Sequence, residues 1–467
     1  MREVNKLYNF CNFNLKIKEP NLSKNELSAQ SFQNVDLYSS SIKTVGGFQG
    51  LFQEIFLNNE SINNEIVNSF IYITTYDYYD SEVFNYKTIY FCIDKNYSLF
   101  KVTYENDSFI LVDLNINFTQ LPEVFTYAGK IYFYQKNEKF IYFENNQDAV
   151  VVSSFADFES YVNYYENSYF ISSSEPYKVF YTEKTDIENL SDDLSVYSEI
   201  LAESSGGRVL KLVSLKNNLY VVSQYAISKV VIDGDDYYLS TNCFIKSKID
   251  EKNIFEINDY LMFFAGGKCF LFDGNEFEEI FSSETKLIQS GEKITGLVFD
   301  NKYYALARLN GDLDKSLLEF DIGKKKVRIF HISNAVSMYK IKSISCYKLV
   351  IVTEEDSVTN GVTDKKYFLF EKCDGGQIFG NRFVKFNSIC FDDTIEKKIS
   401  DIKTVSSGTF TIKISSENGS KLIPVSGNLH VRNLGLSGYG FDIEIYSEDD
   451  FDIKSILFKV QTITEQL

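Results

Sequence analysis

The residues best suited to chemistry in this 467-residue chain include a glycine–lysine segment at 265–269, which reads Ala-Gly-Gly-Lys-Cys. Gly-Gly-Lys resembles part of a phosphate-binding loop. Such a loop, however, needs G-x-x-x-x-G-K followed by Ser or Thr, and it opens a helix. A strand-like run follows Lys268 instead. The spacing therefore predicts a hairpin turn at Gly266 and Gly267.

Two aspartate–glycine segments, 233–236 and 311–314, have the oxygen ligands that Ca²⁺ prefers. Neither has a twelve-residue loop that ends in a bidentate Glu. Asp and Gly are also the usual residues of turns, so we predict a turn at each segment. With only His331 and His430 in the chain, a His-rich metal site cannot be assembled. We expect no metal and no cofactor.

One basic run and two acidic pairs complete the candidates. The basic run, 324–328, lies between Phe320 and Phe330, which predicts a solvated turn between two strands rather than a phosphate contact. The acidic pairs lie at 354–355 and 392–393. Adjacent residues on a strand point to opposite faces, so neither pair can form the facing carboxylates of a glycosidase.

The composition indicates strands rather than helices. The chain has 41 Phe and 33 Tyr but no Trp, 4 Pro and 3 Met, and aromatic side chains pack well across strands. Its 47 basic and 65 acidic residues give a net charge of 47 − 65 = −18. This balance argues against tight binding of nucleic acid and favours solubility.

The cysteine pattern is typical of a reducing compartment. The count is odd and no two cysteines form C-x-x-C, so most are expected to be buried free thiols. The seven are Cys11, Cys92, Cys243, Cys269, Cys346, Cys373 and Cys390. The N-terminal residues lack the apolar core of a signal peptide, and no apolar stretch approaches the ~20 residues of a membrane span. We expect a chain made in the cytoplasm, without membrane contact.

A sequence pattern that repeats along the chain predicts the strands and turns on which these residues lie. Each copy consists of an apolar run, a small polar turn and a Tyr-rich run. The large residues just after the turns are Tyr90, Tyr132, Tyr169, Tyr220, Met262, Tyr304 and Val350, with gaps of 42, 37, 51, 42, 42 and 46. A period of about 40–50 residues with several strands per unit is typical of propeller blades. A second hairpin, as at 269–280, gives four strands per blade. The repeat predicts six or seven blades, and a β-solenoid or stacked sandwiches are the alternatives.

The segments on either side of the repeat differ from it. We expect an N-terminal arm and part of a platform domain at 1–68, with a short helix around 49–58. The β-propeller is expected at 69–375, and a C-terminal β-rich platform domain at 376–467. Strict alternation predicts a half-buried strand at 441–446, and another strand is expected at 456–460. The predicted fold is all-β: a propeller with an accessory, sandwich-like platform.

Catalysis is not expected from these patterns. The chain has no G-x-S-x-G, no H-E-x-x-H and no convincing triad, and a chain without Trp cannot form sialidase-type Asp-boxes. We therefore assign no catalytic residue. A propeller hydrolase would require an acidic cluster that converges at the central channel.

Three segments stand out together. Segment 33–47 contains the motifs N-V-D and S-I-K-T-x-x-G, segment 200–274 contains central hairpins, and segment 429–440 is followed by a strand at 452–456. Together they resemble the opening, the central hairpins and the C-terminal ending of the tail-hub and nozzle proteins of tailed bacteriophages, also called packaged-DNA stabilisation proteins. The chain departs from the family pattern in having no Trp and unusually many Asn, Tyr and Lys.

The resemblance implies a structural virion protein, made in the host cytoplasm and placed in the phage tail. It implies a homo-oligomeric ring, a hexamer, between a portal or head–tail adaptor and the distal tail proteins. DNA would pass through the ring's channel without sequence-specific binding and be retained there before ejection. The family carries no catalytic residues. Two other functions remain open besides the hydrolase: a receptor- or glycan-binding propeller with Tyr-rich contact loops, and an intracellular scaffold ring.

Overall fold

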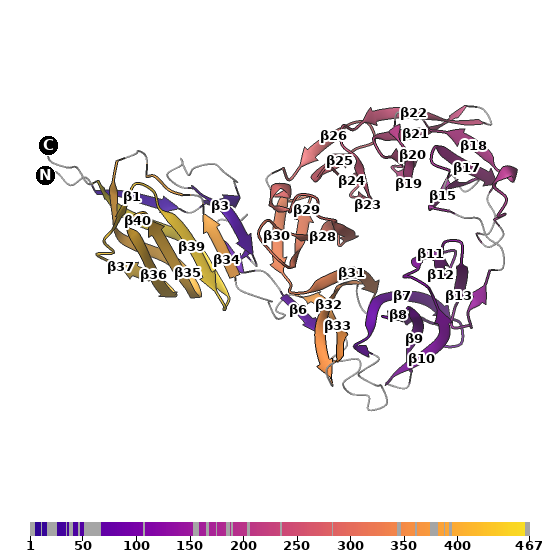
Figure 1. Ribbon diagram of the computed structural model, residues 1–467, viewed down its shortest axis with the longest axis horizontal. Coiled ribbons are helices and arrows are strands. Elements are labelled where there is room, and N and C mark those ends of the chain that lie inside the picture. Colours follow the sequence, from indigo (N-terminus) through magenta and orange to yellow (C-terminus); the bar gives the residue numbers. More distant parts are fainter. Residues whose placement is uncertain are drawn as a thin grey trace.

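The predicted repeat forms seven four-stranded antiparallel sheets arranged in a ring (Figure 1), as seen in a computed structural model. The chain is all-β, with short helices only, and the ring is a seven-bladed β-propeller. The structure describes residues 5–10, 12–15, 26–33, 35–36, 41–44, 47–50, 67–105, 108–152, 158–164, 168–173, 175–183, 187, 190–202, 206–233, 236–282, 284–342, 347–359, 362–373, 382–386, 388–391 and 395–462.

Each blade begins at the central channel and ends at the rim, so its first strand is the inner one (Figure 1). The strands of blades one to three are β7 (Phe70–Asp80), β8 (Asn85–Asp94), β9 (Ser98–Glu105), β10 (Ser108–Asn117), β11 (Glu123–Tyr127), β12 (Lys130–Gln135), β13 (Lys139–Glu144), β14 (Val150–Val151), β15 (Ser160–Tyr164), β16 (Ser168–Ser172), β17 (Lys178–Glu183) and β18 (Ser198–Leu201).

Blades four to seven continue in the same order. Their strands are β19 (Val209–Leu215), β20 (Asn218–Ser223), β21 (Ala226–Asp233), β22 (Asp236–Phe244), β23 (Ile249–Ile257), β24 (Tyr260–Ala265), β25 (Lys268–Phe272), β26 (Phe277–Ile280), β27 (Thr295–Phe299), β28 (Lys302–Arg308), β29 (Lys315–Asp321), β30 (Lys326–His331), β31 (Ala335–Lys342), β32 (Tyr347–Thr359), β33 (Val362–Cys373) and β6 (Gly47–Gly50). Two 3₁₀ helices, η2 (Leu194–Val196) and η4 (Thr285–Leu287), lie in the connections.

The seven residues used to align the repeat lie in the second strand of the seven blades, one in each. All seven are buried: Tyr90, Tyr132, Tyr169, Tyr220, Met262, Tyr304 and Val350. Each second strand is covered on both faces by neighbouring blades, so a large apolar side chain fits at the same point of every repeat. The periodicity therefore reported blade packing, and the prediction of a propeller with four strands per blade is confirmed.

The turns between the first and second strands explain the Asn, Asp and Gly residues of the repeat. Segments 216–217, 258–259 and 300–301 are two-residue loops in which both residues have positive φ, between 49° and 62°. This is the type I′ hairpin turn, which Asn, Asp and Gly tolerate best. Gly266 and Gly267 form the same kind of loop between β24 and β25, with φ of +58° and +76°. The hairpin predicted there is confirmed.

Blade seven is closed by a strand from far away in the sequence. Its first three strands are β31, β32 and β33, and β6 pairs antiparallel with β33, Gly47 opposite Cys373 and Gly50 opposite Phe370. Residues 47–50 thus lie in the propeller, whereas the sequence placed them in an N-terminal arm. The predicted helix at 49–58 is wrong at its start, because β6 includes Gln49 and Gly50, and residues 51–58 lie outside the described part of the chain.

The two ends of the chain build a second, twelve-stranded body, here called the terminal β-body (Figure 1). Its strands are β1 (Asn5–Phe10), β2 (Asn12–Leu15), β3 (Glu26–Gln33), β4 (Val35–Asp36), β5 (Ile42–Thr44), β34 (Arg382–Phe386), β35 (Lys397–Ser416), β36 (Gly419–Ser426), β37 (Leu429–Val431), β38 (Leu436–Gly438), β39 (Asp442–Ser447) and β40 (Phe451–Thr462). The strand predicted at 441–446 is β39, with Ile443 and Ile445 buried, and the one predicted at 456–460 lies within β40.

Strand β35 is the central strand of the terminal β-body and changes partners at Gly408. Up to Gly408 it pairs with β40, and from Thr409 onward with β36. Gly408 has φ +83°, and a Cβ there would lie 2.2 Å from the carbonyl oxygen of Asp450. Only glycine fits this corner, where backbone approaches backbone.

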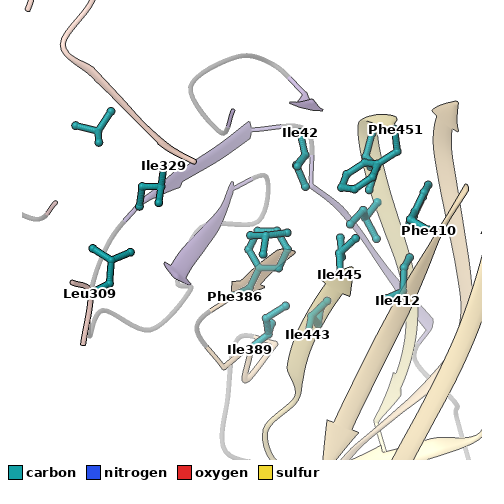
Figure 2. Close-up of a cluster of buried hydrophobic side chains, with 14 of the residues drawn as sticks. Ile42, Leu309, Ile329, Phe386, Ile389, Phe410, Ile412, Ile443, Ile445 and Phe451 are labelled. Atoms are coloured by element: carbon teal, nitrogen blue, oxygen red, sulfur yellow. The ribbon is translucent and has the colours of Figure 1, made fainter. Parts of the chain in front are cut away.

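A continuous apolar core joins the terminal β-body to blades five and six. In Figure 2, Phe386 and Ile389 lie between Ile329 and Leu309 of blade six and the isoleucines of the terminal β-body. Strand β30 of blade six lies beside β3 and β4. The two bodies therefore share buried surface rather than a flexible connection alone. Within the described residues, no helix is long and apolar enough to cross a membrane.

Candidate functional site

A cavity at the central channel is lined by residues of several blades and is here called the channel pocket. Its volume is about 670 Å³, and it opens where the inner strands β15, β19 and β23 begin, with β11 along one side. It is lined by Glu123, Phe125, Thr126, Tyr127, Phe158, Glu159, Ser160, Tyr169, Ile187, Leu210, Lys211, Glu251 and Lys252. Four blades thus contribute to one site.

Strand β11 supplies the most regular wall of the channel pocket. Glu123, Phe125 and Tyr127 alternate along it, and side chains two residues apart point to the same face of a strand. The type I′-like loop at Ala128 and Gly129, with φ of +46° and +78°, ends the strand and holds this register. A second cavity of about 490 Å³ borders the same strand from blades one and seven.

Aromatic rings form the apolar part of the pocket. Phe125 stacks on Tyr132 of β12, with ring centroids 5.1 Å apart and planes at 12°, and meets Phe158 edge-on at 6.2 Å. Tyr127 and Tyr169 join blades two and three through a hydrogen bond between their hydroxyls, with centroids 5.9 Å apart. These contacts fix the rings while leaving Phe125 and Tyr127 partly exposed to the pocket.

Three glutamates line the pocket, but two of them are already paired. Glu159 forms an ion pair with Lys136, and Arg208 pairs with Glu251 at 2.6 Å. Glu123 forms no hydrogen bond or ion pair with any residue that the structure describes. Desolvation by the surrounding groups, and then the nearby Glu159 charge, raise the pKa of the Glu123 carboxyl, although the residue is exposed.

Lys211 lies near Glu123, but its ammonium group interacts with other groups. Its Nζ donates a hydrogen bond to the carbonyl oxygen of Ile254 at 2.9 Å and lies 5.4 Å from the centroid of the Phe255 ring. Burial lowers the pKa of the Lys211 ammonium, and the charge of Glu123 opposes that effect. Lys252, by contrast, is exposed at the mouth of the pocket.

A buried charge cluster lies away from the pocket, between blades six and seven. Glu319 is 1% exposed and is 3.2 Å from Lys302, 3.2 Å from Arg328 and 3.3 Å from Lys372 of blade seven. Tyr304 donates a hydrogen bond to the same carboxylate at 2.9 Å. Burial raises the pKa of Glu319, but the three cations and this hydrogen bond outweigh it and hold the pKa below its usual range.

None of the sequence candidates lines the channel pocket. Lys324 and Lys325 of the basic run lie in the predicted turn between β29 and β30, where Lys324 pairs with Asp321 at 3.6 Å. Residues 326–328 begin β30 instead, and Arg328 pairs with Glu319. Segment 311–314 follows β28 as a turn. Asp233 ends β21 and Asp236 begins β22, while 234–235 lie outside the described residues.

Of the acidic pairs, the structure describes only 354–355, which lies outside the channel pocket. Glu354 lies in β32 and forms an ion pair with Lys365 at 2.8 Å, and 392–393 lie outside the described residues. Among the described residues there is no group of three or more His, Cys, Asp or Glu that could hold a metal ion. Of the four cysteines recorded as free, Cys92 and Cys269 are buried.

The residues of the channel pocket escaped sequence reasoning because no motif marks them. Glu123, Phe125 and Tyr127 showed only the alternation of a strand, which does not tell a channel-facing side chain from a blade-facing one. Their partners from blades three to five are 31 or more residues away, and only the closed ring brings them together.

Comparisons with known proteins find similar solved structures only. No sequence family and no curated protein matches the chain. Solved structures do resemble it. The C-terminal WD40 domain of Sif2 has 10% identity and a TM-score of 0.42, covering 71% of this chain and 99% of its own. The virginiamycin B lyase of Staphylococcus aureus has 11% identity and a TM-score of 0.38, covering 66% and 96%. BamB of Moraxella catarrhalis has 9% identity and a TM-score of 0.37, covering 62% and 80%.

The chain is a β-propeller protein. This follows from the ring of seven four-stranded sheets in the structure itself. At identities of 9–11% and TM-scores of 0.37–0.42, the likeness to these structures adds no argument about function. What those proteins bind or catalyse does not carry over to this chain, whose own side chains must support any function.

Proposed function

We propose that this chain is a non-catalytic structural subunit of a bacteriophage tail, assembled into a ring that extends the DNA channel below the portal. One observation supports the proposal most directly. In the sequence, the closed propeller lies between the two chain ends, and these ends together form the terminal β-body. Asn5 of β1 pairs with Gln461 of β40, and the shared apolar core joins this body to blades five and six. Such a subunit is a stiff building block, suited to a repeated wall.

The charge balance supports passage of DNA rather than binding. The net charge is −18, and within the basic run at 324–328 both Lys324 and Arg328 form ion pairs inside the chain. A protein that holds DNA tightly needs clustered, free Lys and Arg against the phosphates. In the proposed ring, DNA is retained by the ring itself and leaves without sequence-specific contacts. The proposed partners are other copies of the chain, six in the ring, and the portal or adaptor and distal tail proteins.

Gold-labelled antibody against the chain, viewed by electron microscopy on particles from the source culture, tests this function. Label at one tail end or at the head–tail junction supports the proposal. Unlabelled particles, with the protein free in the cytoplasm, overturn it. Mass photometry of the purified chain checks the ring separately, because a hexamer of the 53.8 kDa chain is readily distinguished from a monomer.

A second candidate function is a receptor- or glycan-binding propeller, favoured by an exposed aromatic hairpin tip between β7 and β8. Tyr79, Phe84 and Tyr86 are 48%, 80% and 70% exposed there, and the two tyrosines meet edge-on at 5.4 Å. Exposed aromatic rings are typical contact residues for proteins and sugars. Binding to a glycan array that Phe84→Ala and Tyr86→Ala abolish would support this function, whereas unchanged binding would exclude the tip.

A further inference from the structure

We propose that the channel pocket binds an alkylammonium group, with the Glu123 carboxylate as its ion-pair partner and the Phe125 and Tyr127 rings beside it. This site is independent of the tail function proposed above. Three features of the pocket support this proposal. Glu123 has no ion-pair partner among the described residues, aromatic rings lie next to it, and the neighbouring Lys211 interacts with other groups.

The first step concerns charge within the pocket. Glu159 and Glu251 have their own cations, Lys136 and Arg208. Glu123 has neither an ion pair nor a hydrogen bond among the described residues. Glu123 is exposed at the pocket, so an external cation can reach its carboxylate without displacing another cation. Of the three glutamates, Glu123 is therefore the one that can take an added ammonium group.

The second step concerns the shape and chemistry of the wall. Glu123, Phe125 and Tyr127 lie on the same face of β11, so a cation held by the carboxylate lies next to aromatic rings. Ammonium groups bind to the faces of such rings when they come within about 6 Å of the centroid. The remaining lining, Leu210 and Ile187, suits the alkyl part of the ligand.

The third step concerns the lysines of the pocket, which compete for Glu123. Lys211 is tied to the Ile254 carbonyl and the Phe255 ring, and its burial already disfavours its charge. Lys252 is exposed and lies beyond 4 Å from Glu123, since no ion pair joins them. An external ammonium group can therefore approach Glu123 more closely than either lysine does. Removing the Lys252 charge is expected to strengthen binding.

Isothermal titration calorimetry on the full chain tests the site, with 1,5-diaminopentane and Nα-acetyl-lysine amide as probes and 1-pentanol and Nα-acetyl-norleucine amide as neutral analogues. Both amines are expected to bind and both neutral analogues to fail. Glu123→Gln should weaken binding roughly tenfold through loss of a charge-assisted contact. Glu278→Gln, an equally conservative change on the outer strand β26, should leave binding unchanged. Lys252→Gln should tighten it.

Equal binding by wild type and Glu123→Gln, or equal binding of the amines and their neutral analogues, would overturn the proposal. The two amines also separate the sources of the ammonium group. Tighter binding of the lysine amide points to a lysine side chain of a protein segment, and tighter binding of the diamine points to a free amine. Thermal unfolding of each variant shows that a lost signal is not a lost fold.

Discussion

Single polar side chains make specific links between neighbouring blades. Asn253 of blade five is fully buried, and its Nδ2 donates hydrogen bonds to Asp250 at 2.7 Å and to the carbonyl oxygen of Ile294 at 2.9 Å. Its Oδ1 accepts a hydrogen bond from the hydroxyl of Tyr303 in blade six, at 2.7 Å. Gly296 leaves room for this contact, because a Cβ there would lie 2.0 Å from the Tyr303 hydroxyl. Both blades therefore depend on one buried amide.

Tyr303→Phe is expected to lower the free energy of unfolding by about 1–2 kcal/mol, because the Asn253 Oδ1 is left buried without a donor. Urea unfolding followed by circular dichroism measures the change. Tyr237→Phe serves as the control, since Tyr237 is only partly buried and packs on Phe170 through its ring alone. A Tyr303→Phe protein as stable as that control would contradict the role given to the Asn253 contact.

Glu319→Gln is expected to destabilise the protein by about 2–3 kcal/mol near neutral pH, because Lys302, Arg328 and Lys372 keep their charges without the shared carboxylate. The folded-state pKa of Glu319 lies below its unfolded value. Its stabilising effect is therefore present above the unfolded pKa and lost as pH falls through the folded one.

Urea unfolding of wild type and Glu319→Gln at about pH 7 and about pH 3 checks both statements. The difference between the two proteins should be large at the higher pH and small at the lower. Glu354→Gln is the matched control, because its exposed pair with Lys365 is expected to contribute about 0–1 kcal/mol. A difference that persists at low pH would contradict the role of the ionised carboxylate.

Neither the channel pocket nor the charge cluster around Glu319 could be predicted from the sequence, and the reason is the same for both. Glu319, Lys372 and Glu123 look like ordinary polar residues of strands in the sequence. Whether such a residue faces water, a channel or a neighbouring blade depends on the twist and closure of the ring. Because no recognisable motif marks it, a pocket assembled from four blades could not be located in the sequence.

Among the secondary-structure elements, the hairpins were the most predictable and the closing strand the least. The turns at 258–259 and 300–301 carry Asn and Asp at positive φ, so their local chemistry marks them in the sequence. Strand β6 has four residues, two of them Gly, and pairs with residues more than 300 positions away. Local sequence patterns contain no information on so distant a partner strand. The helix predicted around 49–58 therefore overlapped the end of β6.

Strand β35 gives the sharpest prediction for an element. Gly408→Ala is expected to cost more than about 3 kcal/mol, because the new Cβ would lie 2.2 Å from the Asp450 carbonyl oxygen in addition to the strain of φ +83°. Gly427→Ala also places alanine at a positive φ, +69°, but nothing lies within 4 Å of its Cβ. It should cost only about 1 kcal/mol. Thermal unfolding compares the two, and equal losses would show that backbone strain alone matters at Gly408.

In the whole molecule, the propeller and the terminal β-body share one apolar core, which contains Ile329 of blade six and Ile445 of β39. Two units that share buried surface are expected to unfold together. Differential scanning calorimetry should therefore show one transition for the whole chain. Ile329→Ala should lower its midpoint, because it removes about 2–5 kcal/mol of packing from the shared core. Two well-separated transitions in the wild type would contradict this coupling.

The closing strand of blade seven also has a consequence for the timing of biosynthesis. Residues 47–50 leave the ribosome 370 − 50 = 320 residues before the first residue of their partner segment on β33. At about 5–20 residues per second, roughly 16–64 s separate the two. Six blades can stack during that interval, but the ring stays open until nearly the whole chain has been translated. Nascent chains translated close together on one messenger would then be able to exchange this strand, which yields intertwined dimers in place of closed monomers.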